Sequence, residues 1–158
     1  MKSVIRRAML SVVMMTLLAL SAVGVTVSGQ SANPLVGAWR VTAITDALGP
    51  NTSPQPGLYI FGRQHYSFTR IQGTRPLPEY PSNDKATDAD KVAVFNALYL
   101  NAGTYTVTGN RLATRAMVAK SAFAVGGAGN QFDFAVTGNT LVLTQQPAGA
   151  VITLARLE

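Results

Sequence analysis

Short apolar runs that alternate residue by residue with polar ones recur from position 35 to the end of the chain. Glycine, asparagine or proline separates most of these runs from one another. A period of two is typical of strands with one buried face, and short turn signals between them favour antiparallel neighbours. Two of the turns, Gly109-Asn110 and Gly138-Asn139, tolerate the positive φ angles that a tight hairpin requires. The sequence therefore predicts an all-β fold.

Eight strands can be counted along the chain. They are expected at 35–45, 58–61, 65–71, 103–108, 111–120, 131–137, 140–145 and 150–157. Eight antiparallel strands are enough to close an up-and-down barrel, whose interior is either filled by side chains or holds one small ligand. The strands fit one domain, which we place at 30–158, because a chain of roughly 125 residues suits a single core.

One stretch departs from the strand pattern. Thr87 followed by Asp90 resembles a helix N-terminal capping box, and apolar residues recur at helical spacing after it. We expect one short helix, at about 88–100, that lies against the barrel or across one of its openings. The segment before it, 73–84, contains three prolines and is expected to be irregular.

Three features of these strands carry a resemblance to a known family. They are Gly37-Ala38-Trp39 near the start, Gly103-Thr104-Tyr105-Thr106-Val107 in the middle, and Arg156 in the last strand. Together they resemble the bacterial lipocalin-like family of small barrels, over positions 35–157. The resemblance implies an eight-stranded antiparallel barrel in which Gly37, Trp39 and Arg156 form the closed end, with the tryptophan packed against the arginine. It implies a fold more firmly than a function, because one fold serves many functions.

Strand alternation assigns a set of side chains to the barrel interior. Those that we predict to line a ligand pocket are Tyr66, Phe68, Arg70, Tyr105, Phe132 and Phe134. The strand at 111–120 carries small side chains instead, namely Ala113, Thr114, Ala116 and Ala119. An aromatic wall that faces small residues fits either a cavity for a flat or aliphatic ligand or a tightly packed interior.

Arg70 shares a strand face with Tyr66 and Phe68, and two orientations are open to it. In the first, its long side chain reaches solvent beyond the barrel rim. In the second, it points inward and requires a counterion or an acidic ligand, because an unpaired buried charge is costly. The second orientation would bias the pocket toward apolar molecules that carry a carboxylate.

The first 29 residues have the layout of a secretory signal peptide. Three basic residues precede an uncharged apolar run at 8–22, and small residues follow at Val27-Ser28-Gly29. The alternative is a retained N-terminal membrane anchor, since 8–27 is uncharged and just long enough to cross a bilayer. We expect export to the periplasm or the extracellular space, with no stable membrane insertion after cleavage.

Net charge gives little support for a nucleic-acid partner. The chain has 13 basic and 7 acidic residues, but three of the basic ones lie in the predicted signal peptide, so ten basic and seven acidic residues remain. No basic run, and no array of aromatic and basic residues, accompanies this small excess. We therefore predict no nucleic-acid binding.

Catalytic and metal chemistry has few candidates in this sequence. His65 is the only histidine and cysteine is absent, which removes most zinc, haem and nucleophile-base arrangements. We predict no metal, no cofactor and no catalytic residue. Three function classes remain: an exported carrier of a small hydrophobic ligand, a filled barrel acting as a structural or protein-partner-binding module, and a cyclase- or isomerase-like barrel enzyme. The sequence leaves the oligomeric state open.

Overall fold

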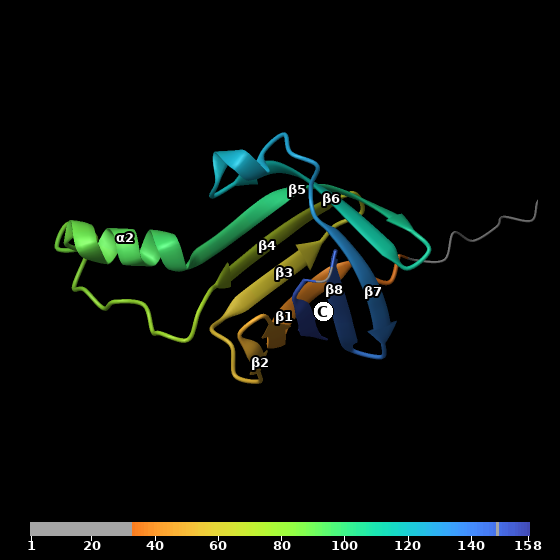
Figure 1. Ribbon diagram of the computed structural model, residues 1–158, viewed down its shortest axis with the longest axis horizontal. Coiled ribbons are helices and arrows are strands. Elements are labelled where there is room, and N and C mark those ends of the chain that lie inside the picture. Colours follow the sequence, from red (N-terminus) through yellow and green to blue (C-terminus); the bar gives the residue numbers. More distant parts are fainter. Residues whose placement is uncertain (1–32, 148) are drawn as a thin grey trace, which may run out of the picture. The chain divides into compact units, whose positions relative to one another are not determined.

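The computed structural model describes residues 33–147 and 149–158, and the predicted signal peptide lies outside them. The described residues form one antiparallel sheet that curls until its first long strand pairs with its last (Figure 1). The elements are β1 (Gly37–Asp46), β2 (Gly49–Asn51), β3 (Gly57–Phe61), β4 (His65–Ile71), α2 (Asp88–Ala97), β5 (Leu98–Thr108), β6 (Arg111–Ala119), η1 (Ala122–Ala124), β7 (Gln131–Thr137), β8 (Thr140–Gln146) and β9 (Val151–Arg156).

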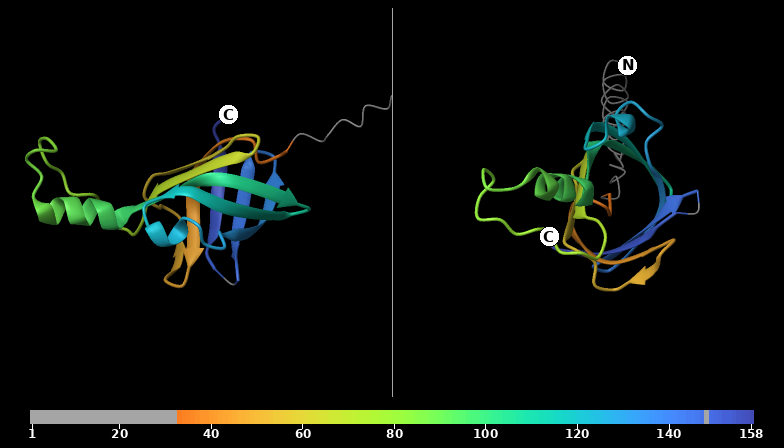
Figure 2. Two further views of the ribbon diagram at one scale, coloured as in Figure 1. Left: turned by 90° about the horizontal axis from the view of Figure 1, so that it is seen from above. Right: turned by 60° about the vertical axis from the view of Figure 1, so that its left-hand side comes forward.

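The sheet closes into a barrel. Its strand order is β2-β1-β3-β4-β5-β6-β7-β8-β9, and β1 also pairs with β9. β2 is a three-residue strand that lies between two of the predicted strands, and it pairs with the end of β1. The other eight strands make the ring seen in Figure 2. The predicted eight-stranded antiparallel up-and-down barrel is confirmed, and Gly109 and Gly138 adopt φ angles of 60° and 56° in the two hairpin turns.

The helix is shorter than predicted. α2 begins at the expected capping box, in which the Asp90 amide donates to Thr87 Oγ1, but it ends at Ala97 instead of position 100. Leu98 already begins β5, because ladder hydrogen bonds to β4 outweigh the helical spacing of the apolar side chains. No α2 residue is buried. The helix projects beyond the strands instead of lying against the barrel or across its opening (Figure 1 and Figure 2).

Lys120 attaches the C-terminal end of α2 to the barrel. Its Nζ donates to the carbonyls of Phe95 and Asn96 at 3.2 and 3.3 Å. The same ammonium group lies 5.2 Å from the centroid of the Phe95 ring. A cation at this position is favourable, since the last carbonyls of a helix carry partial negative charge.

The buried core gathers side chains from around the whole ring. The largest fully buried ones are Trp39, Tyr59, Phe61, Phe68, Leu35, Leu112, Leu141, Leu143 and Leu154. They come from six of the barrel strands and from the segment before β1. Each such side chain contributes about 1.5–3 kcal/mol of transfer free energy when it leaves water.

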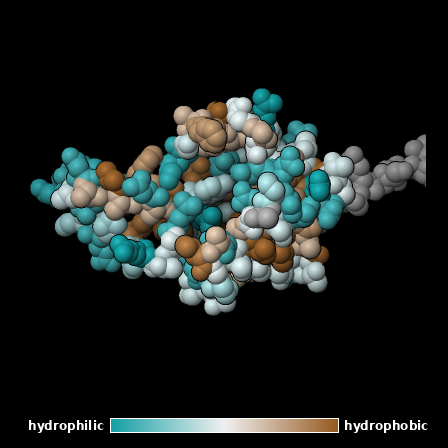
Figure 3. Space-filling view, viewed as in Figure 1, coloured by the Kyte–Doolittle hydropathy of each residue, from teal (hydrophilic) through white to brown (hydrophobic). Residues whose placement is uncertain are grey.

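The outer surface carries apolar groups among polar ones, as the face in Figure 3 shows. Phe95 on α2 and Phe123 in η1 are the exposed phenylalanines, with 56% and 93% of their surface accessible. Within 33–147 and 149–158, no helix combines the length and the apolar character needed to span a bilayer.

Candidate functional site

One end of the barrel is closed by the segment that precedes β1. Trp39 Nε1 donates a hydrogen bond to the Leu35 carbonyl at 2.7 Å. The Arg156 guanidinium lies over the indole, with its central carbon 4.0 Å from the ring. It also donates to the carbonyls of Pro34 and Val36, each at 2.8 Å. The arginine therefore fastens the preceding segment over this end, and we call the resulting structure, residues 33–39 with Arg156, the cap.

Gly37 is required by the geometry of the cap. Its φ angle of 132° lies in a region that side chains with a Cβ rarely adopt. A Cβ at this position would lie 2.4 Å from the Glu158 backbone oxygen and 2.9 Å from an Arg156 guanidinium nitrogen. The structure thus brings together the three residues expected at the barrel end, Gly37, Trp39 and Arg156.

Tyr105 is a second tie to the cap. Its hydroxyl donates to the Gly62 carbonyl and accepts from Asn33 Nδ2, each at 2.7 Å. Its ring meets Phe61 edge-on, with centroids 5.4 Å apart. Tyr105 therefore closes the barrel end instead of facing an open space.

A layer of aromatic rings lies next to the cap. Phe68 stacks on Tyr59 with ring centroids 4.2 Å apart, and it meets Phe61 and Phe132 edge-on at 5.4 and 6.2 Å. Aromatic pairs of this kind contribute roughly 0.5–1.5 kcal/mol beyond their burial. Phe68 is fully buried, so the layer forms a packed floor across the barrel.

Beyond this floor the barrel is hollow. A cavity of about 400 Å³ is lined by Tyr59, Phe132 and Ile152 at its apolar side. Thr114 and Ala116 face it from β6, where their small side chains leave the space. The volume equals that of about 13 water molecules, within the range of roughly 300–1,000 Å³ found for small-molecule sites. The sequence left open whether the barrel is filled or hollow. In the structure, side chains fill the half next to the cap, and the other half holds the cavity.

Arg70 lines the cavity at its rim. It pairs with Gly57 of β3 and with Tyr99 of β5, and its guanidinium carbon lies 5.2 Å from the Tyr99 ring. The side chain is half-buried. Its Nε is buried and has no hydrogen-bond partner among the described residues. Neither of the two orientations left open by the sequence describes the side chain fully, because it lines the cavity and also borders the space outside β1, β3 and β4.

Gly57 provides the room that this arginine needs. A Cβ at Gly57 would lie 2.7 Å from Val41 Cγ2 and 2.9 Å from Arg70 Cβ. Both distances are shorter than van der Waals contact allows. Glycine therefore lets β1, β3 and β4 converge beside the arginine without displacing it.

The rest of the cavity wall presents neutral hydrogen-bonding groups. The Tyr66 hydroxyl donates to Asn101 Oδ1, and Asn130 Nδ2 donates to the Tyr99 hydroxyl at 3.4 Å. Burial raises the pKa of both tyrosines above the ordinary value of 10.0, and the positive charge of Arg70 partly opposes this rise in the pKa of Tyr99. Both phenols are therefore neutral near pH 7. No acidic residue lines the cavity within the described part of the chain.

A loop completes the wall between β6 and β7, which share only three residue pairs. Thr114 holds this loop: its amide donates to the Asn130 carbonyl at 2.9 Å, and its Oγ1 accepts from the Asn130 amide at 3.2 Å. Gly129 has a φ angle of 76°, and a Cβ there would lie 1.7 Å from the Thr114 carbonyl oxygen. The close approach of loop and strand therefore depends on glycine.

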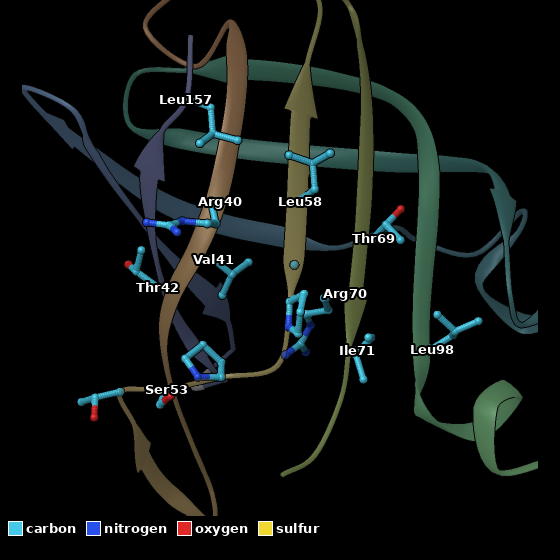
Figure 4. Close-up of a pocket in the computed structure, with 14 residues that line it drawn as sticks. Arg40, Val41, Thr42, Ser53, Leu58, Thr69, Arg70, Ile71, Leu98 and Leu157 are labelled. Atoms are coloured by element: carbon cyan, nitrogen blue, oxygen red, sulfur yellow. The ribbon is translucent and has the colours of Figure 1, made fainter. Parts of the chain in front are cut away.

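A second hollow lies outside the barrel, against β1, β3 and β4 (Figure 4). This outer groove has a volume of about 780 Å³. Leu58, Leu98 and Leu157 are among its apolar lining residues, and Arg40 and Arg70 are its cationic ones. No described acidic residue lines it. Arg70 thus borders both the cavity and the outer groove.

Three of the six residues predicted to contact a ligand line the cavity. These are Tyr66, Arg70 and Phe132. Phe68, Tyr105 and Phe134 lie in or against the packed core instead. Direct ligand contact by any of the six remains a prediction.

Sequence reasoning missed Tyr99 and Asn101 as cavity residues, because it assigned 98–100 to the helix and began the following strand only at 103. A signal for them was present. Tyr99, Asn101, Gly103 and Tyr105 alternate with period two, and this alternation continues the inward face of β5 backward toward α2. Asn130 and Gln145 also line the cavity, but nothing in their local sequence marks them.

Comparison with known proteins identifies the fold. No protein-family model matches the chain, and no curated protein matches it. Among solved structures, it is similar to a lipocalin-like protein from Bacteroides uniformis ATCC 8492, with 14% sequence identity and a TM-score of 0.50, over 79% of this chain and 100% of that one. An uncharacterized protein from Bacteroides eggerthii DSM 20697 aligns with 9% identity and a TM-score of 0.48, over 77% and 98% of the two chains. The first similarity confirms the lipocalin-like fold.

Proposed function

We propose that this protein binds a small apolar molecule with an acidic group inside its barrel, and that Arg70 contacts the acid. The observation that carries the proposal is the buried, unpartnered Nε of Arg70 at the rim of a cavity without an acidic residue. A buried N–H group without a partner costs roughly 1–3 kcal/mol. An oxyanion placed at the rim would accept a hydrogen bond from this nitrogen and neutralise the guanidinium.

The apolar part of the ligand would lie toward the floor. Tyr59, Phe132 and Ile152 offer it ring and methyl surfaces on that side. Where β6 lines the cavity, the side chains of Thr114 and Ala116 are small, so a flat ring or a short chain can approach β6 closely. Lipocalin-like barrels of this size are compatible with such a ligand, since eight strands enclose room for one small molecule.

The test compares an acid with a neutral molecule of the same chain length. Decanoate and decanol are titrated calorimetrically into the wild type, Arg70→Met, Ala116→Trp and the control Arg115→Met, whose arginine is exposed on β6. We expect the wild type to prefer the acid by about ten- to a hundredfold, since a hydrogen bond to a charged group is worth roughly 1.5–3 kcal/mol. Arg70→Met should lose this preference but retain decanol. Ala116→Trp should block both probes, and Arg115→Met should change neither.

Two results would overturn the proposal. One is a wild-type protein that binds neither probe at high micromolar concentration, which would favour a partner-binding module. The other is an Arg70→Met variant with an unchanged preference for the acid.

We also propose that the protein is exported and that its N-terminal segment is removed. The support is the sequence layout alone: basic residues, an uncharged apolar run and small residues in succession over 1–29. N-terminal sequencing of the protein from its own host should find a start between Val25 and Asn33. A membrane-integrated product that begins at Met1 would show the anchor instead.

A further inference from the structure

The cavity and the outer groove differ in size and in character. The cavity, at about 400 Å³, has a partly polar wall, whereas the outer groove, at about 780 Å³, is mainly apolar. An acyl chain that fills the cavity would occupy only the smaller of the two spaces. The larger apolar surface would stay exposed to water, although burying it would be favourable.

Arg70 is the residue that the cavity and the outer groove share. Its side chain borders both spaces, beside Gly57, where the absence of a Cβ leaves room for the side chains of Val41 and Arg70. One guanidinium can be neutralised by one acidic group. Two separate anionic ligands, one in each space, would therefore compete for Arg70.

The charge of the outer groove favours an anionic occupant as well. Arg40 is exposed and lines this groove with Arg70, and no described acidic residue accompanies them. Leu58, at 41% accessibility, and Leu157, at 57%, present apolar surface in the same groove. An apolar chain attached to an acid matches this arrangement.

We infer that the ligand is a two-chain amphiphile joined at an acidic group, with the acid at Arg70, one chain in the cavity and the other in the outer groove. This inference rests on the proposed function, because it assumes that the cavity holds an acidic ligand. It adds the class of molecule: two apolar chains per anion. It also assigns the outer face of β1, β3 and β4 to ligand binding.

The experiment compares one-chain and two-chain phosphates. Octyl phosphate, dioctanoyl phosphatidate and neutral dioctanoylglycerol are titrated below their aggregation limits into the wild type, Leu58→Glu and Leu157→Glu. Ile60→Glu is the matched control, because Ile60 is 43% accessible on the same strand and face but does not line the groove. Native mass spectrometry gives the stoichiometry, and sedimentation gives the oligomeric state.

We expect the wild type to bind one phosphatidate per chain, at least about tenfold more tightly than octyl phosphate, since burying two more methylenes already gives this factor. Leu58→Glu and Leu157→Glu should remove most of that advantage and leave octyl phosphate binding unchanged. Ile60→Glu should alter neither. Dioctanoylglycerol should bind more weakly than phosphatidate.

Other outcomes would overturn the inference. An equal affinity for the two phosphates, or an advantage that survives both groove variants, would show that the second chain lies elsewhere. Two bound octyl phosphates per chain would show two independent sites. A change of oligomeric state in Leu58→Glu would show that the groove holds a second copy of the chain. If octyl phosphate does not bind at all, the proposed function fails first, which distinguishes the two failures.

Discussion

Each half of this barrel has an arginine that lies over an aromatic ring, but the two arginines differ in their hydrogen bonds. In the cap, Arg156 lies over Trp39 at 4.0 Å and donates to two backbone carbonyls. In the hollow half, Arg70 lies over Tyr99 at 5.2 Å, and its Nε has no partner among the described residues. A cation on an aromatic ring is thus a structural fastener where the chain supplies acceptors. It is a candidate binding group where the chain supplies none.

The largest expected effect tests the filled half. Trp39→Ala should lower the free energy of unfolding by about 3–5 kcal/mol, as for other truncations of fully buried aromatic side chains. Tyr99→Ala, in the wall of the hollow half, should lower it by only about 1–2 kcal/mol. Urea unfolding of both variants measures the difference. Equal losses would mean that the two halves are packed alike.

The next largest effect is the difference in stability between variants of Arg156 and Arg70. Arg156→Met removes two hydrogen bonds from a charged donor and should cost about 1–2 kcal/mol. Arg70→Met removes a buried, unpartnered Nε and should therefore leave the free energy of unfolding unchanged or raise it, by up to about 1–3 kcal/mol. Urea unfolding measures both variants. A larger loss of unfolding free energy in Arg70→Met than in Arg156→Met would contradict the different roles of the two arginines.

A double-mutant cycle sharpens the account of the cap. The contact between Trp39 and Arg156 should give a coupling energy of about 0.5–2 kcal/mol when Trp39→Phe and Arg156→Met are combined. The milder substitution at position 39 keeps the fold measurable. Additive losses would show that the stacked geometry itself contributes nothing.

The pH at which the buried tyrosines ionise should be higher than that of free tyrosine. Burial raises the folded-state pKa of Tyr66, Tyr99 and Tyr105. A raised pKa means that the neutral form is favoured in the folded state, so this contribution to stability is present below about pH 10 and is lost as the pH rises through the folded values. An acidic ligand at Arg70 should raise the pKa of Tyr99 further, because it cancels the charge that lowers it, and should leave Tyr105 unchanged. Tyrosinate absorbance of the wild type, Tyr99→Phe and Tyr105→Phe checks this expectation.

The smallest expected effect concerns the attachment of α2. Lys120→Met removes a cation from the last carbonyls of the helix and should cost about 0.5 kcal/mol at low ionic strength. Circular dichroism should show a small loss of helical signal that added salt reproduces in the wild type. A loss that salt does not reproduce would mean that contact with the Phe95 ring, and not charge, holds the helix end.

Much of the barrel could be predicted from local patterns. The turns at Gly109 and Gly138 and the alternation around Phe132 depend on residues near one another in sequence, and the strands there lie as expected. The boundary between α2 and β5 could not be predicted in this way. Leu98 and Tyr99 fit a helical apolar stripe, and only pairing with β4, some thirty residues earlier, makes them a strand.

The candidate site was less predictable than the fold. Alternation places Arg70 on the inner face but does not determine whether its side chain stays inside, since that depends on Gly57 and Tyr99 in neighbouring strands. The same limit applies to Phe68 and Tyr105. Their inward direction is visible in the sequence, but their depth along the barrel is set by strand stagger, which has no local sequence signal.

The closing of the ring by β1 and β9 also governs how the chain reaches its native state. A hydrogen bond from Thr42 to the Thr153 carbonyl spans 111 positions, and that from Arg156 to Pro34 spans 122. Contacts this distant in sequence form slowly, because the entropy of a long loop is lost before they can form. Until the last strand has been synthesised, β1 presents unpaired amide and carbonyl groups along one edge, where another chain can pair. The final strand therefore completes the cap and, at the same moment, protects the nascent protein from aggregation.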